Sequence, residues 1–383
     1  MIIKLYLLGG NNLIVGVFSP VINWCGGAEW VAINIIAALK KHGHQVIVLS
    51  DKIIDQKKIK SVFNREISVD SQIIFPLRFF SSPTNYHNIY TDSLRSLMLK
   101  SKCDVLIDTF SNALLPGVDI AYIHHPLLKK IEMELPFRRN QIFFYPYQNY
   151  LNSSKKNLNN KLIFANSRFT AKAVKTEFGI DPYVLYPPIS NDFKNCAEKN
   201  MLGYRNNNVI TVARICKEKN LNIIPYLAKS TDNKISFTIV GLLDSKEILT
   251  SLQSMIMKFK LSNRVRILTN VTRDHLKELL LTSKVYLHPS INEHFGISIV
   301  EAMSLGCIPI VHDSGGPKEF VPQNLRFKNI ADAAEKVEKT IANWTPTKAT
   351  EFSSYADRFS EKTFSTYFIN ALNSYFDKKK INK

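Results

Sequence analysis

The chain has few cysteines for its length, five among 383 residues, and they are scattered without any Cys-x-x-Cys spacing. A disulfide framework or a zinc site needs thiols that are paired or closely spaced. Both are therefore excluded as organising features. The odd number of thiols predicts a protein of a reducing compartment, the cytoplasm.

Long apolar runs are also missing. The opening segment MIIKLYLLGG is apolar, but Gly9 and Gly10 break it before it is long enough for a membrane span or an ordinary signal peptide. Contact with a membrane is therefore expected only at its surface, on the cytoplasmic face.

Several chemical signatures are absent as well. No Asp-x-Asp occurs in the chain, and this absence fits a mechanism without a metal, so no metal ligand is predicted. The Gly-x-Gly-x-x-Gly fingerprint of nicotinamide dinucleotide binding is missing too. Because no Lys/Arg-rich helix, zinc finger or aromatic RNP motif appears, nucleic acid is not expected as a partner.

Positive charge is what the chain has in excess, with a formal net charge of +18 at pH 7. Phosphate-bearing substrates or an anionic membrane surface would account for such an excess. The alternative is compositional drift, because the chain is rich in Lys, Asn and Ile throughout. Basic and aromatic residues mix in segments 135–139 and 143–147, followed by Lys155 and Lys156. That mixture suits a membrane interface, and equally a helix packed inside a domain with a solvated basic rim.

Short apolar segments alternate with segments of helical periodicity along the chain. The predicted strands are 13–19, 45–50, 104–108, 120–124, 161–166, 183–186, 209–213, 236–240, 265–268, 285–288 and 308–311. The predicted helices are 28–41, 167–178, 221–228, 246–259, 273–282, 296–305, 330–344 and 362–377, with Asn166 or Ser167 capping the second. This spacing predicts parallel, doubly wound α/β sheets. The diproline 187–188 and the polar run 191–208 mark the domain boundary.

Two carboxylates, a histidine and three glycines lie close together in the segments Asn292–Glu301 and Ser314–Pro317. These segments surround one predicted strand–helix–strand unit. Loops at the carboxyl ends of parallel strands form the ligand crevice of such sheets, so these residues predict a site. Glu301 stands among small and apolar residues, where a carboxylate needs partners such as a pair of sugar hydroxyls. Alternatively, Glu293 caps the helix and Glu301 meets a Lys or Arg; the spacing alone leaves both interpretations open.

A Glu-x7-Glu pattern that encloses Phe-Gly-Ile, preceded by Arg-x4-Lys after a strand, resembles the retaining GT-B glycosyltransferases of family 4. The residues of four motifs resemble those of one branch of the family. This branch consists of the GDP-mannose-dependent α-1,2-mannosyltransferases that extend the dolichol-linked oligosaccharide. The four motifs are Gly26–Glu29, Tyr122–Pro126, Glu293–Ile297 and His312–Pro317. The matches keep their order from about residue 13 to about residue 320, so the resemblance covers both halves of the chain.

The resemblance implies a GT-B fold, in which two Rossmann-like domains with doubly wound parallel sheets face an interdomain cleft. We expect an N-terminal acceptor-binding domain at 1–190 and a C-terminal nucleotide-sugar-binding domain at 191–360. A helix at 361–383 is expected to cross back to the first domain. The implied substrates are a nucleotide sugar, GDP-mannose, and a glycan or polyprenyl-linked glycan acceptor, with no cofactor.

Four side chains inherit roles from the family pattern. Arg214 and Lys219 would stabilise the leaving diphosphate in place of a metal, because both residue types suit phosphate. Glu293 would contact the donor hexose and act in catalysis, and Glu301 would hold the ribose hydroxyls. Solvation is the alternative for the two cations.

Backbone N–H groups at turns and helix starts are further donor-binding candidates, because they attract anionic groups. The alternative for the two glycine pairs is a tight turn. The residues concerned are Phe295, Gly296 and Ile297, which would bind the β-phosphate, and Gly26, Gly27, Gly315 and Gly316.

His124 ends a predicted strand and would hydrogen-bond a donor-sugar hydroxyl or the developing charge, so the family pattern makes it catalytic. His125 is the alternative, since the two side chains point to opposite sides of a strand. Competing functions are a UDP-sugar-dependent hexosyltransferase and a non-catalytic nucleotide-sugar or glycan-binding protein. An epimerase or a phosphorylase of similar architecture lacks support, because neither its acid–base set nor a lysine pattern for pyridoxal phosphate is seen.

Overall fold

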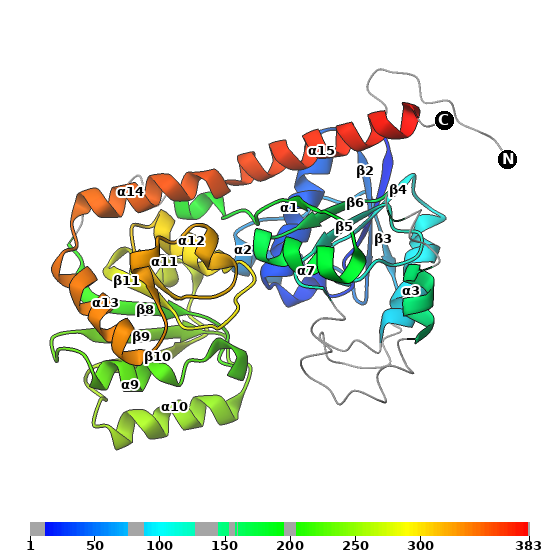
Figure 1. The fold of residues 1–383 in the computed structure, drawn as a ribbon. Helices are drawn as coiled ribbons and strands as arrows, with labels where there is room; N and C mark the ends of the chain where they lie inside the picture. The colour runs from blue at the N-terminus through cyan, green and yellow to red at the C-terminus, as the bar shows by residue number, and fades with distance from the viewer. Residues whose placement is uncertain are drawn as a thin grey trace. The chain divides into compact units, whose positions relative to one another are not determined.

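The computed structural model describes residues 12–75, 88–126, 145–152, 158, 160–194 and 204–381. The chain forms two compact units, the first made of residues 1–186 and 364–383 and the second of residues 187–363. Each unit contains one parallel sheet with helices packed on it (Figure 1).

The sheet of the first unit has the strand order β3-β2-β1-β4-β5-β6-β7. Every neighbouring pair in this sheet is parallel. The strands are β1 (Ile14–Phe18), β2 (Gln45–Ser50), β3 (Ser71–Ile74), β4 (Val105–Asp108), β5 (Ile120–Ile123), β6 (Leu162–Ala165) and β7 (Tyr183–Val184). Helices of this unit include α1 (Gly27–Lys41), α2 (Gln56–Phe63), α3 (Ile89–Lys100) and α7 (Arg168–Phe178).

The sheet of the second unit repeats this order with one strand fewer, β10-β9-β8-β11-β12-β13. All its pairs are parallel as well. The strands are β8 (Asn206–Val212), β9 (Ser236–Gly241), β10 (Val265–Thr269), β11 (Ser283–His288), β12 (Ile308–His312) and β13 (Arg326–Phe327). Its helices include α9 (Ile223–Lys229), α10 (Lys246–Lys258), α11 (Arg273–Leu281), α12 (Ile297–Ser304), α13 (Ile330–Ala342) and α14 (Pro346–Ala356). In a sheet of this order the direction of winding reverses between β8 and β11, and ligands bind beside that reversal.

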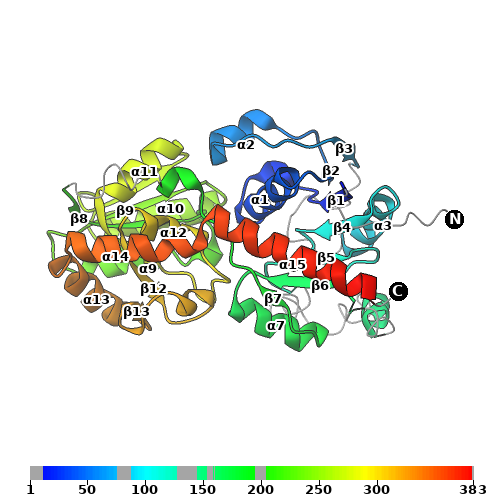
Figure 2. The same cartoon turned by 90° about the horizontal axis from the view of Figure 1, so that it is seen from above.

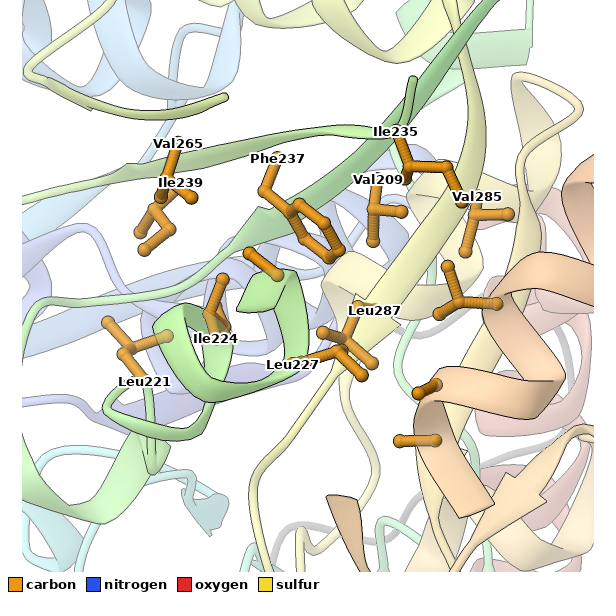
Figure 3. Close-up of a cluster of buried hydrophobic side chains, with 14 of the residues drawn as sticks. Val209, Leu221, Ile224, Leu227, Ile235, Phe237, Ile239, Val265, Val285 and Leu287 are labelled. Atoms are coloured by element: carbon orange, nitrogen blue, oxygen red, sulfur yellow. The ribbon is translucent and has the colours of Figure 1, made fainter. Parts of the chain in front are cut away.

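The core of the second unit lies between one face of its sheet and the helices α9, α10 and α13. Figure 3 shows Phe237 and Val209 from the sheet pointing towards Ile224 and Leu227 of α9. All four side chains are buried. Apolar packing therefore closes this face of the sheet.

The C-terminal helix α15 (Glu361–Ile381) crosses the boundary between the units, and its residues from Phe364 onward belong to the first unit. In Figure 2 it runs beside β5 and β6. The ring of Phe364 lies 6.4 Å from that of Tyr122, and the ring of Phe368 lies 5.8 Å from that of Phe164. Burial of these aromatic rings fixes the helix on the first unit.

The eleven predicted strands are all present, with ends shifted by up to three residues. Ser167 caps α7, as one of the two alternatives predicted, by accepting a hydrogen bond from the Thr170 N–H at 3.1 Å. Five further elements were not predicted, namely α2, α3, α14, β3 and β13. The strands β3 and β13 are short, and the helices α3 and α14 are weakly patterned. The helix α2 has an apolar side at Ile59 and Phe63 but is only eight residues long.

Candidate active site

Two loops of the second unit meet where the sheet reverses its winding. The loop after β8 ends in a short 3-10 helix, η3 (Lys217–Lys219), and the loop after β11 carries Glu293. Lys219 Nζ lies 2.6 Å from Glu293 Oε2. Two predicted site residues that are 74 positions apart in the chain are therefore in direct contact.

Glu293 has three partners. Its Oε2 also accepts a hydrogen bond from His288 Nε2 at 3.0 Å, and its Oε1 accepts one from the His294 N–H at 3.2 Å. Burial alone raises the pKa of Glu293, but the Lys219 charge and the His288 bond together hold that pKa well below its usual range. The side chain is 14% exposed and ionised. It does not cap α12, whose N-cap residue is Gly296.

Arg214 has a different partner from Lys219. Its Nη1 lies 2.7 Å from Oδ2 of Asp244, which follows β9, and both side chains are largely exposed. The structure therefore places the two predicted phosphate cations in the same loop region but on different carboxylates. An exposed ion pair of this kind contributes little to stability, so a phosphate can compete for Arg214 at small cost.

Gly315 and Gly316 allow the loop after β12 to approach the backbone of the Glu293 loop. Gly315 has φ of +73°, and a Cβ there would lie 2.8 Å from the Glu293 N. A Cβ on Gly316 would overlap the carbonyl oxygen of His294. The Gly316 N–H donates to the Glu293 carbonyl at 2.8 Å, so this N–H, which was assigned to a donor phosphate, is already used. These glycines position the Glu293 loop.

Helix α12 begins at Ile297, one residue later than predicted, because Gly296 adopts φ of +85°. Phe295 is buried, and its ring packs 5.2 Å from Phe320 and 5.5 Å from Phe359. This aromatic anchor and the left-handed glycine together set the direction in which the helix leaves the loop. The N–H groups of 295–297 lie at a helix start, where anions are favoured.

Glu301 lies on α12 beside an ion pair that the sequence analysis missed. Arg273 binds Asp192 through Nε at 2.7 Å and Nη2 at 3.0 Å. Burial raises the pKa of Glu301, the Arg273 charge lowers it, and the Asp192 charge raises it again. Within the part of the chain that the structure describes, the Glu301 carboxylate makes no hydrogen bond or ion pair. It therefore keeps acceptor capacity for a ligand, although Arg273 is close enough to influence its charge.

His124 directly follows β5 in the first unit. Its Nε2 donates to the Thr109 carbonyl at 3.2 Å, and its backbone N–H donates to Asn112 Oδ1 at 2.7 Å. Burial lowers the pKa of His124 to about 4, so the imidazole is neutral at pH 7. The ring of His125 packs near Phe169 of α7, whereas that of His124 packs near Tyr122. The two histidines therefore face different neighbours, as strand alternation predicts.

Gly26 is the N-cap residue of α1, and Gly27 is its first residue. The Gly26 N–H donates to the Glu29 carboxylate at 2.8 Å, which is one half of a capping box, since glycine has no side chain to form the other half. A side chain of this chain thus already uses one N–H that was predicted to meet an anion. The Gly26–Glu29 motif serves the start of α1 in this structure.

The residues predicted at a membrane surface fall almost wholly outside the described ranges. These are 135–139, 143–144, Lys155 and Lys156. Of the described residues nearby, Tyr145 is exposed, whereas Tyr147 is buried and its hydroxyl accepts a hydrogen bond from the Leu114 N–H at 2.8 Å. None of the helices in the described ranges is long and apolar enough to span a bilayer.

The fold and the site define the chain as a two-domain α/β protein of the GT-B type, with a charged site at the carboxyl ends of the second sheet. Residues 25–193 match the family Glycosyltransferase Family 4, and residues 194–359 match the family Glycosyl transferases group 1. The chain belongs to the group 1 and family 4 glycosyltransferases. Its activity is therefore transfer of a sugar from a nucleotide sugar to an acceptor.

The chain is similar to the GDP-Man:Man(3)GlcNAc(2)-PP-Dol alpha-1,2-mannosyltransferase of Dictyostelium discoideum, with 24% identity over 94% of this chain and 84% of the relative. It is 22% identical to the phosphatidylinositol N-acetylglucosaminyltransferase GPI3 subunit of Saccharomyces cerevisiae, over 88% of this chain and 76% of the relative. Among solved structures it is similar in fold to Anabaena HepE in complex with UDP and glucose. The TM-score is 0.69 and the identity 17%, over 95% of this chain and 100% of HepE.

Proposed function

We propose that this chain is a retaining glycosyltransferase that moves mannose from GDP-mannose onto a glycan or polyprenyl-linked glycan, without a metal. The observation that carries the proposal is the contact between Lys219 and Glu293 at the reversal of the second sheet. We assign the Lys219 cation to the diphosphate and the Glu293 carboxylate to the sugar that the diphosphate leaves. The Glu-His-Phe-Gly-Ile spelling and the Dictyostelium relative support mannose as the sugar.

The proposed donor complex uses the second unit. The diphosphate lies on Lys219 and Arg214, with the N–H groups at the start of α12 as further donors. Glu293 accepts hydrogen bonds from hydroxyls of the hexose, and Glu301 accepts them from the ribose. Because the two cations are fixed before the reaction, they stabilise charge as it develops on the leaving diphosphate.

The chemical step needs no protein nucleophile. The bond between the anomeric carbon and the diphosphate oxygen breaks, and the acceptor oxygen forms a bond to the same face of that carbon. The acceptor hydroxyl gives its proton to the departing phosphate. The configuration is therefore retained, and the products are the glycosylated acceptor and a nucleoside diphosphate.

Although a histidine can also act as a cation or an acid, His124 serves in this proposal only as a hydrogen-bond acceptor. Its Nε2–H is donated to the Thr109 carbonyl, and its pKa of about 4 keeps the ring neutral. The remaining ring nitrogen can only accept a hydrogen bond. His124 therefore accepts from a sugar hydroxyl and supplies no positive charge.

Two observations support a UDP-sugar as the alternative donor. The yeast relative is named as an N-acetylglucosaminyltransferase, and the HepE structure contains UDP. A non-catalytic sugar-binding protein is a weaker alternative, because Arg214, Lys219, Glu293 and Glu301 are all present.

The test is a panel of nucleotide sugars. The purified chain is incubated with GDP-mannose, UDP-glucose and UDP-N-acetylglucosamine together with a polyprenyl-diphosphate-linked chitobiose-mannose acceptor, and nucleoside diphosphate release is measured. We expect release of GDP from GDP-mannose alone. Release of UDP instead would establish the alternative donor, and binding without release in every case would support the non-catalytic function.

An acceptor on a polyprenyl lipid requires the chain to work at a membrane surface. Besides the charge of +18, α3 supports this proposal, because Leu94, Leu97 and Met98 form an exposed apolar face, with Leu94 64% exposed. The check is co-sedimentation with vesicles that contain anionic phosphatidylglycerol or neutral phosphatidylcholine alone. Serine at all three positions should abolish binding to the anionic vesicles, whereas Met257→Ser, at an equally exposed position on α10, should not.

A further inference from the structure

His288 is a deeply buried titratable side chain in contact with Glu293, and the mechanism above does not use it. It ends β11, is 2% exposed, and stacks on Tyr286 with ring centroids 6.2 Å apart and planes inclined by 17°. Because the ionised Glu293 can only accept, the bond of 3.0 Å between them has His288 Nε2–H as donor. The tautomer is thereby fixed.

The other ring nitrogen explains why His288 stays neutral. Nδ1 is buried and has no hydrogen-bond partner among the residues that the structure describes. A proton there would create a buried N–H without an acceptor, which is costly. His288 therefore offers Glu293 one directed hydrogen bond and no charge.

Lys219 and His288 contact the same oxygen, Oε2 of Glu293, whereas Oε1 is held by the backbone N–H of His294. In the proposed donor complex Lys219 has a second anion, the diphosphate. The Lys219 ammonium has three N–H donors, but its single charge is then shared between Glu293, which it contacts at 2.6 Å, and the diphosphate. We therefore expect the ion pair with Glu293 to weaken when the donor binds.

We propose that His288 is a positioning residue, which keeps the Glu293 carboxylate in place while Lys219 exchanges this carboxylate for the donor diphosphate. Before donor binding, Lys219 and His288 hold Oε2 together. After donor binding, His288 and the His294 N–H are the two remaining constraints on Glu293. This inference rests on the proposed function, because it needs a donor diphosphate at Lys219.

Two amide substitutions test the role, because Gln and Asn place a donor at different distances from the backbone. The Gln side-chain nitrogen reaches the position of histidine Nε2, whereas that of Asn reaches only the position of Nδ1. We expect His288→Gln to retain kcat to within about three-fold and His288→Asn to lose about 10- to 100-fold, the size of one hydrogen bond to a charged group. His288→Leu should equal His288→Asn.

Two readouts and one control variant separate this role from simple packing. The loss should appear in kcat and leave the donor KM nearly unchanged, since the bond matters after Lys219 has turned to the donor. In a Glu293→Gln background, His288→Asn should cost little more. His275→Asn, at an exposed histidine on α11, is the matched control and should behave as the wild type.

The measurements use the full chain with GDP-mannose, UDP-glucose and UDP-N-acetylglucosamine, and thermal unfolding shows whether each variant folds. Equal kcat values for His288→Gln and His288→Asn would overturn the inference, and so would additive losses with Glu293→Gln. If the wild-type chain turns over one of these donors, such results contradict the role of His288 alone. If the wild-type chain neither binds nor turns over any of these donors, the proposed function fails and this inference fails with it.

Discussion

Asp192 and Arg273 form a two-pronged ion pair, with the guanidinium Nε and Nη2 2.7 and 3.0 Å from the two carboxylate oxygens. The Arg273 guanidinium carbon also lies 4.6 Å from the centre of the Phe193 ring. The pair ties the first residues of the second unit to the start of α11, beside Glu301. It influences both the stability of the unit and the charge of the site.

Breaking this ion pair should destabilise the second unit. Asp192→Ala removes one partner of a mostly buried pair, and we expect a loss of about 3 kcal/mol in the free energy of unfolding. The measurement is denaturant unfolding followed by fluorescence. Asp181→Ala removes an exposed partner of Lys175 and serves as the control, with an expected loss below about 0.5 kcal/mol. Equal effects of the two variants would contradict the importance of the Asp192 pair.

The same pair should set the pH dependence of donor binding. Glu301 accepts hydroxyl hydrogens when ionised, and its raised pKa makes donor affinity fall as the pH decreases through that pKa. Arg273→Met removes a charge that lowers the pKa of Glu301, so the fall should begin at higher pH. Asp192→Asn removes a charge that raises it, so the fall should begin at lower pH. Donor KM measured against pH gives both shifts, and shifts in one common direction would disprove the assignment.

Gly316→Ala should disturb the loop that carries Glu293. The new Cβ would overlap the His294 carbonyl oxygen, so the loop must move, at a cost of about 1–3 kcal/mol. Turnover should fall together with stability. Gly179→Ala is the control, because its φ is +71° and nothing lies within 4 Å of a Cβ there. It should cost about 1 kcal/mol and leave turnover intact. A Gly316→Ala variant with normal turnover would show that the loop tolerates the shift.

His124 should make the first unit less stable in acid. Its pKa is about 4 in the folded chain, below its value of 6.5 when unperturbed, so the unfolded chain binds more protons between these values. Stability therefore falls as the pH decreases from about 6.5 towards 4, by about 2 kcal/mol at pH 5. His124→Gln should remove that part of the slope in unfolding measured at several pH values. An unchanged slope would mean that His124 is not buried as a neutral ring.

Chelation should leave transfer intact. If Lys219 and Arg214 stabilise the leaving diphosphate, EDTA should change kcat by less than about two-fold, because no divalent ion takes part in the step. Lys219→Met, in contrast, should lose about 100- to 1,000-fold. Loss of activity on chelation that returns when Mg²⁺ or Mn²⁺ is added would refute the metal-free mechanism.

The fold was largely predictable because parallel strands buried on both faces are apolar runs of distinct composition. Ile308–His312 and Gln45–Ser50 are of this kind, and the prediction found both. The short edge strands β3 and β13 were missed, since an edge strand is less buried and carries a weaker pattern. The helix α14 was missed because its apolar residues do not form a clear stripe.

The candidate residues of the site could be predicted from the sequence, but their pairings could not. Lys219, Glu293 and Glu301 were found through motif spacing. His288 was missed, although a polar residue at the end of a buried strand is a usable signal. Asp192 and Arg273 carried no such signal, because they are 81 positions apart and belong to no motif.

By itself, the sequence determined the doubly wound architecture and the family, and it named candidate residues for the site, because periodicity and motif spelling are local properties of the chain. The tertiary structure decided which charges meet: Lys219 with Glu293, Arg214 with Asp244, and Arg273 with Asp192. Partner choice depends on which strand ends lie side by side. That adjacency follows from the order of the sheet, in which β8 pairs with β11 across 70 or more residues of chain.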